Sequence, residues 1–232
     1  MKKISIIIPA YNERDFIGRA IEAAAELDCQ KEIIVVDDCS IDGTREILKN
    51  LQKEFKFKLL VHQKNQGKGA AIRTGLKEAQ GAYSIVYDAD LEYQAKDILF
   101  LLKEMEKIQK SSLREIAVYG SRFLKNYSDK FSLHYLANCF LTFLTNRLFG
   151  LNLTDMETCL KLCPTKILKE LGLTAKRFEF EPEVTAKLAK RGVVIIERPI
   201  HYSRRTYQQG KKIRFRDGVM AIKTLIRERF KV

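Results

Sequence analysis

The stretch Tyr83-Ser-Ile-Val-Tyr-Asp-Ala-Asp90 decides the fold, because a strand of apolar and aromatic residues runs directly into two carboxylates. A strand of this composition is typical of a sheet that is covered on both faces. Asp88 and Asp90 lie two residues apart at its end and would repel one another unless a cation lay between them. Mg²⁺ and Mn²⁺ prefer carboxylate oxygens, so these residues and the nearby Glu92 predict a divalent metal site. The alternative for so short a pattern is a solvated acidic turn.

Two earlier segments repeat this arrangement of an apolar strand followed by polar residues. Residues 4–8 run into Pro9-Ala-Tyr-Asn-Glu13, and residues 32–36 run into Asp37-Asp38. Helical patterns at 13–27, from 44 onward and at 68–79, with a further strand at 58–61, complete the alternation. Repeated β-α-β units predict an α/β fold with a mostly parallel central sheet and helices on both faces. Ligands bind such sheets beyond the carboxyl ends of the strands, where these polar residues lie.

The second half of the chain has sparser strand signals, but no linker or internal repeat divides it. Helical patterns cover residues 97–110, 131–149, 181–191 and 215–230, and short strand patterns cover 115–119 and 193–196. In the second of these helices, Leu133, Leu136 and Phe140 share one face. We therefore expect a single domain. Residues 1–210 form its main body, and residues 211–232 form a basic amphipathic helix that is part of the same domain or lies at a membrane interface.

The charge of the chain is concentrated at one end. The 232 residues are 46% hydrophobic and 31% charged, an ordinary globular balance, but 42 Lys and Arg against 29 Asp and Glu leave a net charge of +13. Residues 201–232 alone hold 10 basic and 2 acidic side chains. A local basic patch indicates a partner that carries phosphates, which includes nucleotides, nucleic acids and anionic lipids.

Several other functional classes lack their motifs. Asn65-Gln-Gly-Lys-Gly-Ala70 has the wrong spacing for a Walker phosphate loop, although its glycines permit close approach of an anion at a helix N-terminus. No GxGxxG follows the first strand, which argues against a dinucleotide site, and neither GxSxG nor HExxH is present. Five cysteines without a CxxC pair favour reduced thiols in the cytosol over disulfides or a zinc site.

The sequence predicts no membrane span. The apolar run at residues 4–8 is too short for the apolar core of a signal peptide. The longest apolar stretch, residues 131–151, contains His134, Asn138, Asn146 and Arg147 and falls below the hydrophobicity of a spanning helix.

Four segments of the first half, in their order and spacing, resemble family 2 glycosyltransferases of the GT-A (nucleotide-diphospho-sugar transferase) fold. They are residues 6–13 (IIIPAYNE), 35–44 (VVDDCSIDGT), 65–69 (NQGKG) and 88–90 (DAD). Residues 120–122 (GSR), 153–159 (LTDMETC), 178–183 (FEFEPE), 198–202 (RPIHY), Arg205 and 210–213 (GKKI) resemble the polyprenyl-phosphate branch, which includes dolichol-phosphate mannose synthase. The chain departs from the family pattern at Cys39, where glycine is usual, at Ile41, and at Gln94-Ala95.

The resemblance implies a role for individual residues. The nucleotide's base and ribose would be held by Pro9, Tyr11, Glu13 and Asp38, with Lys68 nearby. The metal that bridges the diphosphate would be held by Asp88, Asp90 and Glu92, and Asp88 and Lys212 would also bind the nucleotide sugar. Phosphate groups would face Arg122 and Arg205, and Arg205 and Lys212 would lie on a segment that closes over the site. Asp155 and Glu157 would border the acceptor. The catalytic set is therefore Asp90, Arg122, Asp155 and Arg205.

The resemblance further implies an inverting, metal-dependent hexosyltransferase that uses Mg²⁺ or Mn²⁺. It would move a sugar from GDP-mannose or a UDP-hexose to a polyprenyl phosphate in cell-envelope synthesis. The nucleotide and the sugar stay open, because each common donor fits one diphosphate–metal site. The two amphipathic helices, 131–149 and 215–230, would contact the cytoplasmic face of a membrane or a membrane partner protein, so the protein would be cytoplasmic and peripheral.

Two alternatives remain beside this interpretation. In the first alternative the acceptor is a saccharide, whose hydroxyl would need a carboxylate as a general base. Asp155 and Glu157 are the candidates for that base. The second is a non-enzymatic nucleic-acid-binding protein, because aromatic residues interleave with the basic residues of the C-terminal segment. The acidic strand ends argue against it, since they would repel a polyanion, and we expect no nucleic-acid partner.

Overall fold

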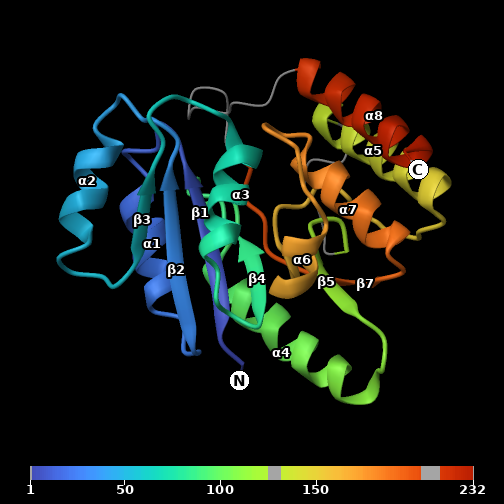
Figure 1. Ribbon diagram of the computed structural model, residues 1–232, viewed down its shortest axis with the longest axis horizontal. Helices are drawn as coiled ribbons and strands as arrows, with labels where there is room; N and C mark the ends of the chain where they lie inside the picture. Colours follow the sequence, from blue (N-terminus) through green and yellow to red (C-terminus); the bar gives the residue numbers. More distant parts are fainter. Residues whose placement is uncertain (1, 125–131, 205–214, 232) are drawn as a thin grey trace.

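A seven-stranded sheet forms the centre of the molecule (Figure 1). The computed structural model describes residues 2–124, 132–204 and 215–231. The strands are β1 (Ile4–Ala10), β2 (Lys31–Asp37), β3 (Lys58–Val61), β4 (Tyr83–Val86), β5 (Ile116–Ser121), β6 (Lys161–Pro164) and β7 (Val194–Pro199). Their order across the sheet is β3-β2-β1-β4-β6-β5-β7.

The sheet is mainly parallel, as predicted. β1 pairs in parallel with β2 and β4, β2 with β3, and β5 with β7. The exception is β6, which runs antiparallel between β4 and β5. The sequence analysis did not predict β6, because its four residues begin with a charged Lys161 and end with Pro164, a residue that cannot donate to a sheet ladder.

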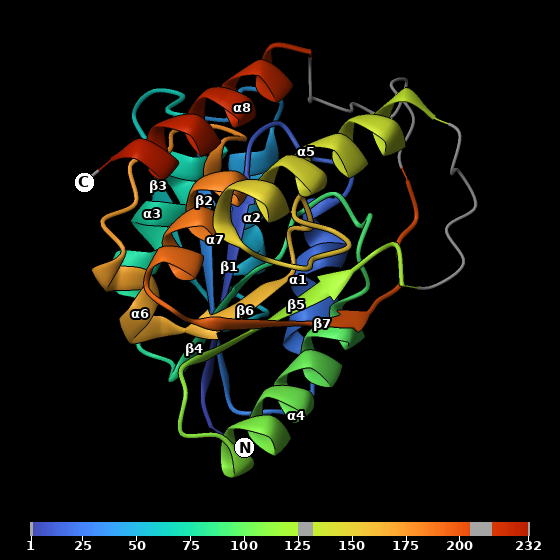
Figure 2. The same ribbon diagram turned by 90° about the vertical axis from the view of Figure 1, so that its right-hand side faces the viewer.

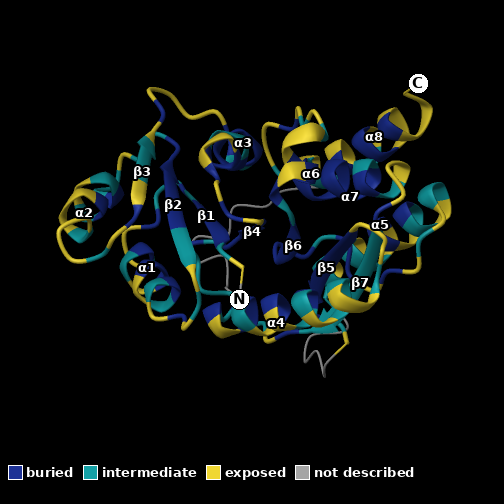
Figure 3. Ribbon diagram, turned by 60° about the horizontal axis from the view of Figure 1, so that its bottom comes forward, coloured by how far each residue is buried: buried dark blue, intermediate teal, exposed yellow. Residues whose placement is uncertain are grey.

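Helices cover both faces of the sheet, which confirms the second part of the fold prediction (Figure 3). On one face lie α3, α6 and α7, and on the other lie α1 and α4, while α2 covers the β3 edge. The helices are α1 (Ile17–Ala25), α2 (Thr44–Leu51), α3 (Lys68–Glu78), α4 (Ala95–Ser111), α5 (Leu133–Phe149), α6 (Thr165–Glu170), α7 (Phe180–Lys190) and α8 (Phe215–Phe230). The first helix begins at Ile17 rather than at 13, because the amides of Phe16 and Ile17 both donate to the carbonyl of Glu13 in a turn.

The main core lies on both sides of the central strands. Ile6, Ile7 and Ile8 of β1 are all fully buried, because alternate residues point to opposite covered faces. Burial of each such side chain contributes about 1.5–3 kcal/mol. α3 lies close against β1 and β2 at Gly75, where an added Cβ would lie 2.6 Å from Cγ2 of Ile7. This close packing fixes the N-terminus of α3 at the carboxyl edge of the sheet.

A second, smaller core joins α5, α7 and α8. Helices α5 and α8 lie side by side at one end of the molecule in both ribbon views (Figures 1 and 2). The buried residues between them are Leu141, Leu153, Met156, Ala186, Ala221 and Leu225. Leu133, Leu136 and Phe140, which share one face of α5, are exposed instead. The helix therefore buries a narrow face through Leu141, Thr142 and Thr145 and presents its larger apolar side chains outward.

Candidate active site

The carboxyl ends of β1, β2 and β4 open into a cleft of about 1030 Å³, and α5 and α8 form its opposite wall. Most residues that the sequence analysis selected line this cleft. They are Pro9, Tyr11, Glu13, Asp38, Lys68, Asp88, Asp90, Glu92, Arg122 and Glu157. Asp155 is fully buried behind the cleft. Arg205 and Lys212 lie outside the described residues, so their roles stay predictions.

Asp88, which follows the end of β4, is held by Lys68. Nζ of Lys68 lies 2.9 Å from Oδ2 of Asp88 and 3.1 Å from Oε1 of Glu181, which comes from the first turn of α7. Burial alone would lower the pKa of Lys68, but Asp88 and Glu181 raise it well above its usual value. The lysine therefore stays protonated and neutralises part of the acidic strand end.

Asp90 is buried among other carboxylates. Burial, followed by the charges of Asp88 and Glu92, raises the pKa of Asp90 to about 7. Its Oδ1 accepts a hydrogen bond from the amide of Glu92 at 3.1 Å. The carboxylate of Glu92 is held from the opposite side, because the hydroxyl of Tyr202 donates to its Oε2 at 2.7 Å. Three acidic side chains thus meet the same end of the cleft.

The chemistry of this acidic end fits a hard divalent cation. Repulsion among Asp88, Asp90 and Glu92 is what such a cation relieves, and all three offer oxygen ligands. In the described part of the chain, no three His, Cys, Asp or Glu side chains converge as a complete cation site. Mg²⁺ does not need one, since it typically binds one or two carboxylates together with phosphate oxygens of a substrate.

Asp38 anchors the loop that precedes α3. Its Oδ1 accepts from the amide of Gln66 at 2.8 Å and faces Nδ1 of His62 at 2.7 Å, and its Oδ2 accepts from the amide of Gly67 at 2.7 Å. A carboxylate has about four acceptor positions, so one on Oδ2 stays open toward a ligand. Gly67 has a φ of +94°, and a Cβ there would lie 2.4 Å from the carbonyl oxygen of Lys176. The loop needs glycine at this position for both reasons.

The segment after β1 is joined to the segment after β2. The amide of Asn12 donates to Oγ of Ser40, and Oδ1 of Asn12 accepts from the amide of Ile41. Asn12 and Cys39 have φ values of +51° and +65°, in the left-handed region that most L-residues avoid. This conformation explains why the resembling family usually has glycine where this chain has Cys39. The left-handed conformation strains the backbone by about 1–2 kcal/mol per residue.

Arg122 directly follows β5 and is fixed by a buried carboxylate. Its Nε and Nη2 donate to the two oxygens of Asp155 at 2.7 and 2.6 Å, and its amide donates to the same carboxylate at 2.9 Å. The guanidinium lies between the rings of Phe123 and Tyr202, 5.3 and 5.2 Å from their centroids. The predicted catalytic residue Asp155 therefore binds Arg122 and does not face the cleft, which makes it a positioning residue.

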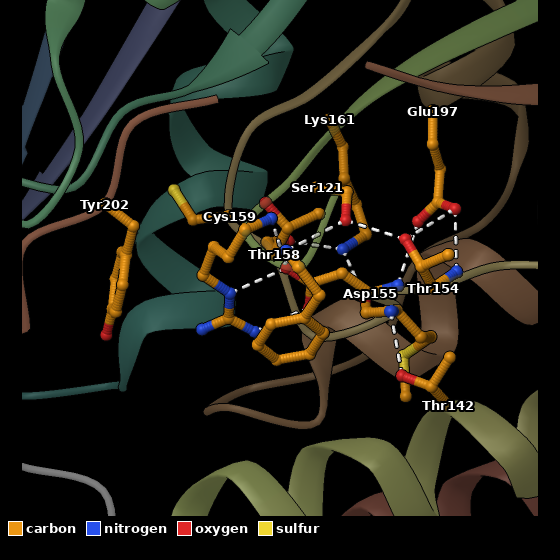
Figure 4. Close-up of polar contacts among 12 residues, drawn as sticks. Ser121, Thr142, Thr154, Asp155, Thr158, Cys159, Lys161, Glu197 and Tyr202 are labelled. Atoms are coloured by element: carbon orange, nitrogen blue, oxygen red, sulfur yellow. Dashed lines mark hydrogen bonds and ion pairs between the residues drawn. The ribbon is translucent and has the colours of Figure 1, made fainter. Parts of the chain in front are cut away.

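The segment that carries Asp155 is itself fixed from three elements of the second half (Figure 4). Glu197 of β7 accepts from the amides of Thr154 and Asp155 at 2.7 and 2.9 Å. Thr142 of α5 accepts from the amide of Met156 at 3.0 Å. Lys161 of β6 donates to the carbonyls of Met156 and Thr158. The unpredicted strand β6 therefore helps to hold Arg122 in place.

A family model described as glycosyl transferase family 2 matches residues 5–172. The chain belongs to this family. Among curated relatives, it is 30% identical over 190 residues to dodecaprenyl-phosphate galacturonate synthase of Rhizobium johnstonii, across 78% of this chain and 53% of that protein. It is 38% identical over 127 residues to dolichol-phosphate mannosyltransferase of Pyrococcus furiosus, across 53% of this chain and 34% of that protein. The chain thus spans about half or less of the length of these relatives.

Solved structures show the same fold as this family 2 chain. Glucosyl-3-phosphoglycerate synthase of Mycobacterium tuberculosis, in complex with Mn²⁺, UDP and phosphoglyceric acid, matches with a TM-score of 0.71 at 17% identity, over 99% of this chain and 79% of that one. A mannosyltransferase of Pyrobaculum calidifontis, in complex with GDP-Man and Mn²⁺, matches with a TM-score of 0.61 at 22% identity, over 84% and 54%. The predicted GT-A fold is confirmed, and the family favours an enzyme over a nucleic-acid-binding protein.

The family 2 fold brings further residues into the cleft that the sequence analysis gave no role. Glu181 binds Lys68, Tyr202 binds Glu92 and stacks on Arg122, and Arg177 lines the rim beside Gly67. Glu181 and Tyr202 lie within the segments FEFEPE and RPIHY that carry the family resemblance, so the signal was present. Their partners are 80 or more residues away in the chain, and nothing in the local pattern identifies those partners.

Proposed function

We propose that this family 2 chain is an inverting, metal-dependent glycosyltransferase that moves a hexosyl group from a nucleoside-diphosphate sugar to the phosphate of a polyprenyl phosphate. The observation that carries the proposal is the layout of one cleft. It has an acidic strand end with Asp88 and Asp90, a fixed guanidinium at Arg122 and an apolar wall formed by α5 and α8.

The acidic end is suited to the donor. Asp88, Asp90 and Glu92 would hold a Mg²⁺ or Mn²⁺ ion, which when bound would neutralise the charge that develops on the diphosphate leaving group. Pro9, Tyr11, Glu13 and Asp38 would hold the base and ribose, and Lys68 lies between this region and Asp88. The curated relatives and the mannosyltransferase complex support such a donor by their names.

Arg122 is suited to bind a phosphate group. Asp155 occupies its Nε and Nη2, and Nη1 has no partner in residues 2–124, 132–204 and 215–231. A guanidinium that is fixed by a carboxylate and two rings loses little freedom when it binds an anion. An acceptor phosphate is already ionised near neutral pH, so its oxygen needs no general base to attack C1. The bond from C1 to the diphosphate then breaks, and the electron pair leaves with the nucleoside diphosphate.

The apolar wall is suited to a lipid and a membrane surface. Leu133 is 84% exposed, Leu136 54% and Phe143 61%, and all three lie on α5 at or beside the mouth of the cleft. α8 adds exposed Lys223, Arg227 and Arg229, and each basic residue near an anionic surface contributes about 1 kcal/mol. No helix in the described residues is long and apolar enough to span a bilayer. We infer a peripheral position on the cytoplasmic face of a membrane.

A reconstituted transfer assay tests this function. The purified chain is incubated with GDP-, UDP- and dTDP-sugars, Mn²⁺ and undecaprenyl or dolichyl phosphate, and glycolipid is detected by mass spectrometry. We expect a glycolipid from at least one donor, and a loss of at least about a hundredfold for Asp88→Asn and Asp90→Asn. The proposal fails if no donor gives a product while an established polyprenyl-phosphate transferase does so in the same mixture.

A second candidate keeps the donor but uses a saccharide as the acceptor. It is favoured by Glu157, a carboxyl in the cleft without a hydrogen-bond partner among the described residues, which is what a general base for a hydroxyl requires. Asp155 is no longer a candidate base, because both of its oxygens bind Arg122. With a lipid phosphate as acceptor, Glu157→Gln should retain turnover within about tenfold, whereas loss of a base should lower it by about 10²–10⁴.

A further inference from the structure

The floor of the cleft between Asp88 and Arg122 is lined by acidic side chains. Lys68 joins Asp88 to Glu181, and among the surrounding charges Glu181 affects the carboxyl of Glu157 most, ahead of Lys161. Glu157 in turn lies within electrostatic reach of Arg122. Glu157 and Glu181 therefore line the same cleft as the proposed metal-binding end and the guanidinium.

Glu157 differs from the other acidic residues of this floor because no group among the described residues binds its buried Oε1. Asp155 is bound by Arg122, Glu181 by Lys68, and Asp88 by Lys68. Oε1 of Glu157 is shielded from solvent and has no hydrogen-bond partner within the described chain. Within the described part of the chain four buried polar atoms lack a partner, and of these Oε1 of Glu157 is the one whose residue lines the cleft.

A buried carboxyl oxygen without a partner is unfavourable, so it calls for a ligand that supplies one. Burial and the nearby Glu181 raise the pKa of Glu157 to about 7. Near neutral pH the carboxyl therefore has both protonation states, and it can donate to a hydroxyl group or accept from one. Such a group suits a sugar ring, which offers hydroxyls that act as donor and acceptor alike.

This inference rests on the proposed function. A sugar in transit from a diphosphate to an acceptor phosphate must lie between the two, and Glu157 lines the cleft that holds both groups, within electrostatic reach of Arg122 and of Glu181, the partner of Lys68. We propose that Glu157 is the specificity-determining residue for the transferred sugar, binds one of its hydroxyls, and favours a neutral hexosyl group over a hexuronosyl group. A uronic acid would bring a third carboxyl against Glu157 and Glu181, and their mutual repulsion disfavours it.

The experiment compares donors that differ only in the sugar's carboxylate. Dissociation constants are measured by calorimetry with Mn²⁺ for UDP-glucose against UDP-glucuronate and for GDP-mannose against GDP-mannuronate. UDP and GDP alone report on the nucleotide and metal part of the site. We expect the wild-type chain to bind the neutral sugar donor at least tenfold more tightly than the uronate donor with the same nucleotide. Glu157→Gln should reduce that preference at least fivefold, while the affinity for the free nucleoside diphosphate stays the same.

Two further variants make the result specific. Glu157→Ala removes the carboxyl and its hydrogen bonds, so it should weaken the neutral donor while leaving the free diphosphate unchanged. Glu26→Gln removes an exposed carboxylate at the end of α1, and the preference should equal that of the wild type. Thermal unfolding of each variant reports whether it is folded.

The two hypotheses fail in different ways. A wild-type chain that binds neither UDP nor GDP with Mn²⁺ overturns the proposed function and this inference with it. A chain that binds a diphosphate tightly but shows no preference for the neutral sugar, or the same preference after Glu157→Gln, overturns the inference alone.

Discussion

At the scale of single residues, the charged side chains of the cleft are held in place by specific partners. Arg122 is bound by Asp155 and lies between two aromatic rings, and Asp38 is bound by two backbone amides. These contacts fix side chains before a ligand arrives, which reduces the conformational entropy that binding must overcome. The buried Oε1 of Glu157 has no hydrogen-bond partner among the described residues, and that is the reason for proposing that Glu157 binds the sugar.

Tyr202 connects the two ends of the cleft. Its hydroxyl donates to Glu92 and its ring lies against the guanidinium of Arg122. Tyr202→Phe removes the first contact and keeps the second, whereas Tyr202→Leu removes both. The net contribution of such a hydrogen bond is about 0.5–1.5 kcal/mol, so Tyr202→Phe should weaken Mn²⁺ binding in the presence of donor by about two- to tenfold.

Electron paramagnetic resonance of Mn²⁺ measures the affinity of the protein for Mn²⁺. Turnover measured at saturating Mn²⁺ then reports the loss of the ring contact with Arg122 separately from the loss of Mn²⁺ affinity. Tyr202→Phe should recover near wild-type turnover when Mn²⁺ is saturating, and Tyr202→Leu should not. Equal Mn²⁺ affinity in wild type and Tyr202→Phe would show that Glu92 needs no support from the tyrosine.

At the scale of elements, loops and helix ends bring residues from distant parts of the chain together. The loop before α3 lies against the segment before α7, where the amide of Ala70 donates to the carbonyl of Lys176. That second segment is held by Glu183 of α7, whose carboxylate accepts from the amides of Thr174 and Ala175 and pairs with Lys187 at 2.9 Å. One buried carboxylate thus supports the segment against which the loop before α3 packs.

Glu183 predicts how stability depends on pH. Burial alone would raise its pKa, but the hydrogen bonds from Ala175, Lys187 and Thr174 lower it below its ordinary value of 4.5. A carboxyl with a lower pKa in the folded state stabilises the fold fully above the unfolded pKa, and this contribution is lost as the pH falls through the folded pKa. The wild type should therefore lose stability as the pH decreases below about 4.5.

Urea unfolding between pH 3 and pH 7 measures this effect. Glu183→Gln cannot ionise, so it should be less stable at pH 7 and should show a smaller decrease toward pH 3. Loss of a buried, hydrogen-bonded charge whose partners remain typically lowers stability by about 3–5 kcal/mol. Parallel curves for wild type and variant would contradict the assignment. Glu26→Gln is the matched surface control.

At the scale of the whole molecule, the cleft lies between the ends of the strands and a wall of two helices. The strands β1, β2 and β4 supply one side, and α5 and α8, which lie side by side at one end, supply the other (Figure 2). The exposed apolar side chains of α5 and the basic side chains of α8 therefore lie next to the mouth of the cleft. A membrane bound there would present its lipids directly to the site.

Membrane binding is predicted to depend on this end of the molecule. Leu136→Glu with Phe143→Glu places two charges on the exposed face of α5, outside the cleft lining, and should lower the partition onto vesicles with anionic lipid by at least about tenfold. Leu113→Glu changes an equally apolar, fully exposed residue after α4 and should have no effect. Vesicle sedimentation measures the partition, and calorimetry with Mn²⁺ and donor checks that the donor site is unchanged. Equal partition of all three proteins would overturn the peripheral position.

Much of the donor side could be predicted from the sequence because its signals are local. A parallel sheet brings the ends of its strands to one edge, so Asp88, Asp90 and Asp38 could be assigned to one cleft from strand patterns alone. The acceptor side could not be predicted in the same way. Asp155 was taken for a group that faces the acceptor, but its position beneath Arg122 depends on contacts from β6, α5 and β7 that no local pattern encodes.

The sequence by itself determined the α/β architecture, the acidic strand ends and the family, because periodicity and short motifs depend on neighbours in the chain. The tertiary structure alone decided which charges are paired and which are left for a ligand. Lys68 meets Glu181 across 113 positions and Tyr202 meets Glu92 across 110, and only folding brings such pairs together. The lack of a hydrogen-bond partner for Oε1 of Glu157 among the described residues is likewise a property of its surroundings, since burial and neighbouring charge are set by packing.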